Sequence, residues 1–273
     1  MNNQKIVFIG GGNMGSCLIA GLIADGYSPQ AIHVVDPDQL IREQLNLEYQ
    51  INAHESPQQA LDSAEIVVLA VKPQIMERAV NGIKSLLDLP RPLIISIAAG
   101  IRTETLAAWL EEDLPIVRTM PNTPSMVGSG ASGLFATESV STDQRGMAES
   151  VMRAVGIIQW LENESLMDAV TAVSGSGPAY FFRMMEAMEK AAVKLGLSKD
   201  QARLLTIQTA FGAAKMALES PNDPATLRVQ VTSPGGTTEQ ALNVFDQKNI
   251  DAIFEQALSA AKIQSEKLST DLG

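Results

Sequence analysis

Short apolar runs alternate with segments of helical spacing over residues 5–161, and this alternation constrains the fold more than any other feature of the chain. The runs are rich in Val and Ile, and they occupy residues 5–10, 32–36, 65–71, 92–100 and 115–120. Because they are continuously apolar, they predict strands that are buried on both faces, as in a parallel sheet covered by helices. The segments of helical spacing between them are 13–25, 38–48, 74–88 and 103–112. The pattern predicts an α/β fold with a doubly wound parallel sheet.

Two further candidates could extend this sheet, at residues 132–137 and 156–161, on either side of a predicted helix at about 142–154. Strand patterns end near Ser165, so we predict a nucleotide-binding domain over residues 1–163 and an all-helical domain over 164–273. The predicted helix at 201–219 is apolar on nearly every side, and such a helix requires burial on most faces. We favour a partner subunit that covers part of it, and hence a homo-oligomer; burial at the centre of its own bundle is the alternative.

A glycine motif follows the first predicted strand directly. Gly10, Gly12 and Gly15 satisfy the spacing G-x-G-x-x-G between a strand and a helix. In a Rossmann-type domain the first glycine makes the turn, the second lets the backbone approach a pyrophosphate, and the third lets helix and strand pack closely. The context favours a dinucleotide site over a simple glycine turn.

An acidic residue ends the second predicted strand. Asp36 lies 21 residues after Gly15, where a carboxylate accepts hydrogen bonds from a ribose 2′-hydroxyl and repels a 2′-phosphate. Arg42 is the only cation near it in sequence. Asp36 therefore favours NADH, although the alternative for it is a helix cap, a role that Asp38 could fill equally well.

The composition excludes several classes of partner. With 20 Lys and Arg against 31 Asp and Glu, the net charge is −11, which argues against nucleic acid or an anionic membrane as the main partner. No apolar run reaches the roughly 18 residues of a membrane span. The first residues reach glycine too early for a signal peptide, and Cys17 is the only cysteine. We therefore expect a cytoplasmic protein.

No obvious catalytic acid or metal site is present in the sequence. We expect His33 to begin the second strand and His54 to lie in the loop after it, both in structural or exposed positions. There is no H-E-x-x-H motif and no cluster of cysteines or carboxylates with metal spacing, so we predict no metal. Three loops rich in glycine and hydroxyl groups remain as candidates, at residues 118–132, 172–182 and 232–238; in the last, backbone N–H groups form a cradle suited to a carboxylate.

The segments "FIGGGNMG", "AVKPQ", "SIAAGI", "MPNTP", "AVSGSGPAYFF" and "VTSPGGTTEQAL", in this order, resemble the Δ1-pyrroline-5-carboxylate reductase family over essentially the whole chain. The resemblance implies a Rossmann domain followed by an all-α dimerisation domain, and dimers that often assemble further into a decamer. It also implies hydride transfer from NADPH or NADH to the C=N carbon of pyrroline-5-carboxylate, the small-molecule substrate, to give L-proline.

The resemblance assigns site residues by position. Thr238 would direct its hydroxyl at the ring nitrogen as the catalytic residue. The substrate carboxylate would be held by Ser233, Gly236 and Thr237. The cofactor would be bound by Gly10, Gly12, Asn13, Met14, Gly15, Asp36, Ala70, Val71, Lys72, Pro73, Ala98, Ala99, Gly100, Pro121 and Asn122. From the residues alone, Lys72 is equally well a phosphate contact or a solvated surface lysine.

Two other functions remain as alternatives. A β-hydroxyacid dehydrogenase would place a catalytic lysine early on the first long helix, where this chain has Phe181 and Phe182 and its first lysine is Lys190. A non-catalytic dinucleotide-sensing protein would have no use for the cradle at Ser233–Thr238.

Overall fold

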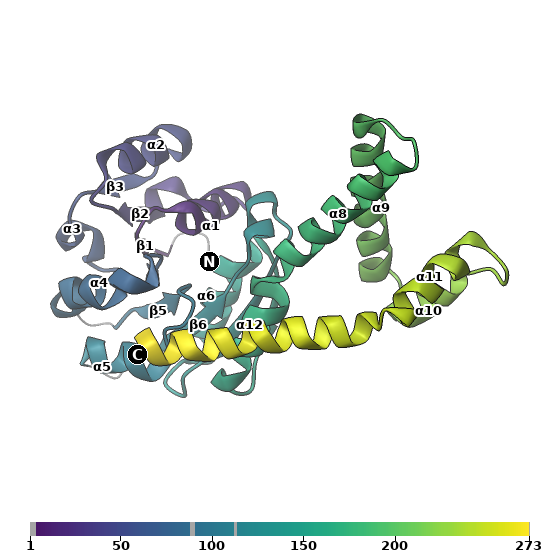
Figure 1. Ribbon diagram of the computed structural model, residues 1–273. Helices are drawn as coiled ribbons and strands as arrows, with labels where there is room; N and C mark the ends of the chain where they lie inside the picture. Colours follow the sequence, from purple (N-terminus) through teal and green to yellow (C-terminus); the bar gives the residue numbers. More distant parts are fainter. Residues whose placement is uncertain (1–3, 88–90, 112–113, 273) are drawn as a thin grey trace. The chain divides into compact units, whose positions relative to one another are not determined.

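The structure is a computed structural model that describes residues 4–87, 91–111 and 114–272. It divides into two compact units: unit 1 comprises Met1–Ser176 and Ala260–Gly273, and unit 2 comprises Gly177–Ser259 (Figure 1). The sequence places the domain boundary at residue 163, which stays a prediction.

Unit 1 contains an eight-stranded sheet in the order β3-β2-β1-β4-β5-β6-β7-β8. The strands are β1 (Ile6–Ile9), β2 (Ile32–Val35), β3 (Asn52–His54), β4 (Ile66–Leu69), β5 (Leu93–Ser96), β6 (Ile116–Met120), β7 (Gly130–Ala136) and β8 (Gly156–Trp160). All neighbouring strands are parallel except β6 and β7, which are antiparallel. The predicted doubly wound sheet is confirmed, and both extension candidates belong to it.

Helices cover both faces of this sheet (Figure 1). One face is covered by α1 (Asn13–Ala24), α2 (Gln39–Tyr49) and α6 (Thr142–Arg153); the other is covered by α3 (Pro57–Leu61), α4 (Met76–Ile83) and α5 (Thr103–Leu110). Phe8, Leu18 and Met152 belong to the first core, and Val7, Val80 and Leu106 belong to the second. Successive residues of β1 therefore enter opposite cores, which is why its sequence is continuously apolar.

The stretch between α2 and β4 differs from the prediction. We expected His54 in a loop, but it ends β3, which pairs in parallel with β2. The short strand was missed because its sequence, Asn-Ala-His, has no apolar run to mark it. The predicted helix at 74–88 is a 3-10 turn (Pro73–Ile75), then α4, then a second 3-10 turn (Lys84–Leu86).

Beyond β8 the chain is helical, as predicted. A short helix, α7 (Met167–Val170), precedes unit 2, which contains α8 (Gly177–Lys194), α9 (Lys199–Glu219), α10 (Pro224–Gln230) and α11 (Thr237–Gln247). The last helix, α12 (Ile250–Leu272), begins in unit 2 and ends in unit 1. Ser198 and Gln201 form a capping box that begins α9 after the turn at Gly196.

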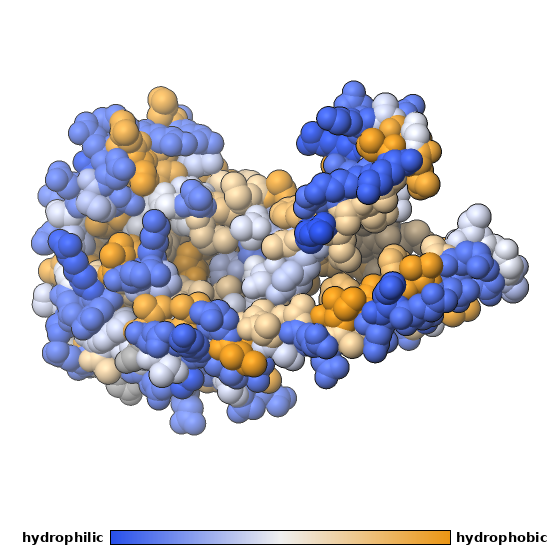
Figure 2. All heavy atoms as spheres, in the orientation of Figure 1, coloured by the Kyte–Doolittle hydropathy of each residue, from blue (hydrophilic) through white to orange (hydrophobic). Residues whose placement is uncertain are grey.

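Unit 2 exposes many large apolar side chains, and Figure 2 shows apolar residues along its helices. Within residues 177–259, all of which the structure describes, Ala202 is the only buried hydrophobic residue. On α9, Leu204 is 69% exposed and Phe211 is 60% exposed. The alternative in which α9 lies at the centre of its own bundle is therefore wrong, and apolar exposure of this extent marks a surface for interaction with another molecule.

Candidate functional site

The glycine motif forms a tight turn between β1 and α1. A Cβ atom on Gly15 would lie 2.6 Å from the carbonyl oxygen of Gly10, which is closer than real Cβ contacts allow. Gly12 is the N-cap residue of α1 and has no side-chain cap; apart from its chain neighbours, no described residue lies within 4 Å of its Cβ position. Gly15 is thus required by packing, whereas Gly12 leaves open space in front of the helix N-terminus, where a phosphate group would fit.

Asp36 organises this turn. Its Oδ2 accepts a hydrogen bond from the backbone N–H of Gly11 at 2.8 Å, and its Oδ1 accepts one from the N–H of Asp38 at 2.9 Å. Arg42 Nη1 donates to the backbone oxygen of Asp36 at 2.7 Å. The cap of α2 is Asp38, whose carboxylate accepts from the N–H of Leu40 at 2.9 Å. Asp36 therefore has a role that is distinct from capping, next to the second glycine of the motif.

A cavity of about 860 Å³ opens at the carboxyl ends of β1, β2 and β4. The strand order reverses between β1 and β4, and dinucleotides bind at such a switch point. Residues at the carboxyl ends of β1 and β4 line the cavity. Those predicted from the sequence are Gly10, Gly12, Asp36, Ala70, Val71 and Lys72, and Pro37, Ile75 and Arg78 lie beside them. The mixed apolar and polar lining suits a nucleotide, and it brings six of the predicted cofactor residues together.

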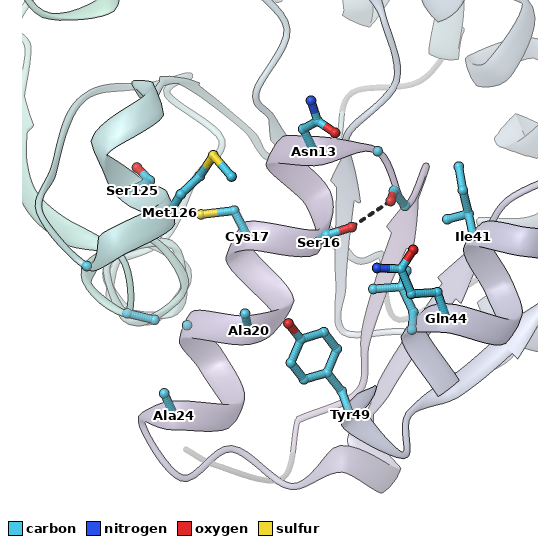
Figure 3. Close-up of a pocket in the computed structure, with 16 residues that line it drawn as sticks. Asn13, Ser16, Cys17, Ala20, Ala24, Ile41, Gln44, Tyr49, Ser125 and Met126 are labelled. Carbon is cyan, nitrogen blue, oxygen red and sulfur yellow. Dashed lines mark hydrogen bonds between the residues drawn. The ribbon is translucent and has the colours of Figure 1, made fainter. Parts of the chain in front are cut away.

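A second groove, of about 510 Å³, runs along α1 (Figure 3). Gly12 lines both this groove and the first cavity. Asn13 lies at one end and Ala24 at the other, and Ser16 Oγ donates to the Gly11 carbonyl oxygen at 2.7 Å. Cys17 faces Met126 in this groove (Figure 3), and burial raises the pKa of its thiol, which favours the protonated form. Of the predicted cofactor residues, Asn13 lines this groove rather than the larger cavity.

Met14 lies in the first turn of α1 and Pro73 begins the 3-10 turn after β4, and neither lines the two cavities. Five further predicted cofactor residues, Ala98, Ala99, Gly100, Pro121 and Asn122, follow β5 and β6. The backbone N–H of Ala98 donates to Ser96 Oγ at 3.4 Å, and Thr119 Oγ1 donates to the Ser96 carbonyl oxygen at 3.1 Å. Asn122 Nδ2 donates to the Ser174 carbonyl oxygen at 3.0 Å, while Asn122 Oδ1 accepts from the N–H of Ala131 at 2.9 Å. Asn122 is 8% exposed and joins the "MPNTP" segment to the "SGSG" segment.

The "SPGGTT" loop belongs to unit 2 and begins α11. The N–H of Gly236 donates to the Ser233 carbonyl oxygen at 2.9 Å, and the N–H of Gly235 donates to Glu239 Oε2 at 2.9 Å. Gly236 is the N-cap residue and provides no side-chain cap. Thr237 and Thr238 are the first two residues of the helix. The amides of that first turn are the groups best placed to receive a carboxylate.

The two histidines form a stacked pair on β2 and β3. His33 Nδ1 and His54 Nε2 lie 3.0 Å apart, and the ring planes are inclined by 10°. Burial, with Lys5 and His54 nearby, lowers the pKa of His33 to about 4, and burial also lowers the pKa of His54. Both rings are therefore neutral at pH 7 and serve the edge of the sheet rather than catalysis.

This pair predicts a loss of stability in acid. The pKa of His33 is about 4 in the folded chain and 6.5 as the ordinary value, so the unfolded chain binds more protons between these limits. Because the ring is only half-buried, we expect the free energy of unfolding to fall by about 1 kcal/mol between pH 6.5 and pH 4. Urea unfolding at several pH values measures this. The variant His33→Phe should lack that part of the decline, and an identical pH dependence in both proteins would contradict the assignment.

Two buried polar contacts were not predicted from the sequence. Arg118 on β6 pairs with Glu164 at 2.9 Å, and Ser265 Oγ donates to Asp168 Oδ1 at 2.7 Å. The two residues of the first pair lie 46 positions apart in the sequence and those of the second pair 97 positions apart, and no local motif surrounds either pair. Among the described residues no group of three or more His, Cys, Asp or Glu could hold a metal ion. Over the same part of the chain, no helix combines the length and apolarity that a membrane span requires.

Two family models match the chain. One, described as "NADP oxidoreductase coenzyme F420-dependent", matches residues 5–100, and one, described as "Pyrroline-5-carboxylate reductase dimerisation", matches residues 164–268. The first covers the glycine turn and the larger cavity. The second covers the helices with exposed apolar faces and the "SPGGTT" loop.

Whole-chain relatives agree with these models. A pyrroline-5-carboxylate reductase of Pseudomonas aeruginosa is 49% identical over 273 residues and covers 100% of both chains. The structure of a pyrroline-5-carboxylate reductase from Coxiella burnetii matches with a TM-score of 0.95 and 45% identity, covering 98% of this chain and 99% of that one. A pyrroline carboxylate reductase of Plasmodium falciparum, solved with NADP bound, matches with a TM-score of 0.86 and 30% identity over 98% and 99% of the two chains. This chain belongs to the pyrroline-5-carboxylate reductase family, the NAD(P)-dependent oxidoreductases that its glycine turn, sheet and helical unit had indicated.

Proposed function

We propose that this protein reduces 1-pyrroline-5-carboxylate to L-proline with NADH or NADPH. The observation that carries the proposal is the first turn of α11, where Thr237 and Thr238 follow two glycines whose own N–H groups donate to Ser233 and to the Glu239 carboxylate. Such a turn binds an anion without a buried positive side chain. It accounts for substrate recognition in a chain whose site has no lysine or histidine assigned to the reaction.

The larger cavity fits a dinucleotide on structural grounds. The open space at Gly12 admits a pyrophosphate close to the backbone, and the cavity supplies apolar walls at Val71 and Ile75 for an adenine ring. When bound, the cofactor supplies a hydride. The residues after β5 and β6, including Ala98, Ala99, Gly100, Pro121 and Asn122, would then line the nicotinamide end.

The protein's part in the reaction is binding and orientation. Ser233 and the amide of Thr237 hold the substrate carboxylate, and the Thr238 hydroxyl contacts the ring nitrogen. The N–H of Gly236, which the sequence also assigned to the carboxylate, donates to the Ser233 carbonyl oxygen in this structure. A protonated imine is already electrophilic, so its carbon accepts the hydride and its nitrogen keeps the proton as an amine. No side chain has to transfer a proton to the ring nitrogen, which agrees with the neutral histidine pair lying at the β2–β3 edge of the sheet.

We also propose that the functional form is a homodimer, in which a second copy covers the apolar faces of α8 and α9. Phe181 is 57% exposed and Phe182 is 63% exposed on α8, and the large apolar residues of α9 described above are exposed as well. Further assembly of dimers into a decamer and a cytoplasmic location are parts of the same proposal. The carboxylate-rich composition, with a net charge of −11, supports a small-molecule partner rather than nucleic acid.

Asp36 leads to a prediction about the cofactor. Its buried carboxylate lies at the end of β2 and would repel a 2′-phosphate, so we expect a higher kcat/KM with NADH than with NADPH. The variant Asp36→Asn removes the charge but keeps an acceptor oxygen, and we expect it to shift the ratio of the two kcat/KM values towards NADPH. Steady-state kinetics with both cofactors measure this ratio. A strong preference of the unmodified protein for NADPH would contradict this role of Asp36.

Two alternatives make different demands on the chain. A β-hydroxyacid dehydrogenase needs a lysine where α8 carries Phe181 and Phe182, and a non-catalytic dinucleotide sensor needs no anion-binding turn at α11. Cofactor oxidation with pyrroline-5-carboxylate, compared with cofactor reduction with a 3-hydroxyacid, distinguishes all three functions.

A further inference from the structure

A partly buried ion pair joins three segments of unit 1 near the loop that follows β5. The carboxylate of Glu164 accepts hydrogen bonds from the Thr103 backbone N–H at 2.8 Å, from Thr103 Oγ1 at 2.6 Å and from Arg118 Nη1 at 2.9 Å. The side chain of Arg118 is 4% exposed and that of Glu164 is 19% exposed. Glu164 begins a 3-10 turn (Glu164–Leu166), Thr103 begins α5, and Arg118 lies on β6.

Glu164 caps α5 from a distant part of the sequence. Thr103 is the first residue of that helix, and the N-cap residue, Arg102, provides no side-chain cap. The carboxylate supplied from 61 residues away satisfies a free N–H group and places negative charge at the helix N-terminus. It therefore fixes the point at which the loop at residues 97–102 enters α5.

Contacts with other segments also hold the loop at residues 97–102 at its beginning and in its middle. Ser96 accepts the Ala98 N–H and the Thr119 hydroxyl at the beginning of the loop. In the loop itself, Ala98 and Ile101 belong to the buried cluster against which Leu272 packs, in the part of α12 that belongs to unit 1. With Glu164 at the far end, the loop has a fixed place at its start, its middle and its end.

Arg118 connects the ion pair to the second segment assigned to the nicotinamide. It lies on β6 three residues before Pro121, and its backbone pairs with Ser96 of β5. One carboxylate thus anchors both the loop after β5 and the strand that leads to Pro121 and Asn122. We propose that Glu164 is a positioning residue that sets the nicotinamide-side loop for hydride transfer, an inference that rests on the proposed function.

Stability alone does not require this arrangement. Burying an ion pair costs desolvation free energy, and apolar side chains of similar volume commonly stabilise a fold as well or better. The three hydrogen bonds to Glu164 fix the orientation of Thr103 and Arg118. A small displacement of a reacting group has a large effect on rate, so orientation is the property that an activity measurement detects.

The test uses Glu164→Gln, which removes the charge and keeps an acceptor oxygen, and Thr103→Val, which removes one hydrogen bond and keeps the ion pair. We expect kcat to fall by about 10- to 100-fold in Glu164→Gln and by less in Thr103→Val. The primary isotope effect on kcat with 4-deuterated NAD(P)H should increase, because hydride transfer becomes slower relative to other steps. Affinity for NAD(P)H should fall, while affinity for ADP-ribose, which lacks the nicotinamide, should stay unchanged.

Glu149→Gln is the matched control. Glu149 also accepts a short hydrogen bond, from Trp160 Nε1 at 2.6 Å, and pairs with Arg153, but it lies on α6 at the opposite face of the sheet. We expect its kcat and isotope effect to equal those of the unmodified protein. The inference is overturned if Glu164→Gln matches this control, or if it binds NAD(P)H and ADP-ribose equally less well, which would indicate a general loss of structure.

Failure of the inference and failure of the proposed function are distinguishable. If the unmodified protein does not reduce pyrroline-5-carboxylate, the proposed function is wrong, and the comparison of NAD(P)H with ADP-ribose binding still tests the role of Glu164 at the nicotinamide. If the unmodified protein is active and Glu164→Gln is equally active, only the inference is wrong.

Discussion

We expect Gly12→Ala to lower the affinity for NAD(P)H by about 100-fold, or about 2.7 kcal/mol, without lowering the melting temperature. Apart from its two chain neighbours, no described residue lies within 4 Å of the Cβ position at Gly12, so the added methyl group meets no other part of the fold. It does enter the space where a pyrophosphate approaches the N-terminus of α1. Titration of the protein's effect on NAD(P)H fluorescence measures affinity, and thermal unfolding measures stability.

Gly15→Ala is the matched variant, with the opposite expectation for stability. Its methyl group would lie 2.6 Å from the Gly10 carbonyl oxygen, so the backbone of the turn must shift, at a cost of about 1–3 kcal/mol in the free energy of unfolding. Unchanged NAD(P)H affinity in Gly12→Ala would show that the cofactor does not approach this turn. Equal losses of stability in both variants would show that Gly12 is required by the fold.

The second large effect concerns Thr238. We expect Thr238→Ala to lower kcat/KM for pyrroline-5-carboxylate by about 10- to 100-fold, which corresponds to about 1.4–2.7 kcal/mol for one polar contact at the ring nitrogen. Thr238 is the second residue of α11, and its side chain makes no cap for that helix, so stability should change little. Steady-state kinetics at a saturating cofactor concentration measure the effect.

Thr238→Ser is the control for this experiment, because it keeps the hydroxyl group and removes only a methyl group. We expect it to retain most of the activity. An unchanged kcat/KM in Thr238→Ala would contradict the role of the hydroxyl, and equal losses in the Ala and Ser variants would assign the effect to the methyl group instead.

The sheet was largely predictable from the sequence because its strands are buried on both faces. Runs such as Ile6–Ile9 and Ile66–Leu69 are continuously apolar, and that local property identifies a covered strand without knowledge of its neighbours. Strand direction is different. Nothing within Gly130–Ala136 distinguishes a parallel partner from an antiparallel one, so the reversal between β6 and β7 became visible only in the structure.

The site was predictable where a local motif carries it. Gly10, Gly12 and Gly15 have a fixed spacing. Gly10 and Gly12 line the larger cavity, and at Gly15 the backbone of Gly10 lies too close for any side chain. The partners of Asp36 could not be derived in the same way, since its carboxylate accepts from Gly11, 25 residues earlier in the chain. Glu164 had no motif around it, and its place beside Arg118 and Thr103 depends on three segments folding together.

Hydride transfer to a cyclic imine is the activity on which every role proposed for these residues depends. The most direct measurement is the decrease in absorbance at the nicotinamide wavelength on mixing the purified protein with NADH or NADPH and pyrroline-5-carboxylate, with identification of the product. We predict cofactor oxidation with stoichiometric formation of L-proline. Absence of oxidation with both cofactors, or turnover with a 3-hydroxyacid instead, would contradict the account.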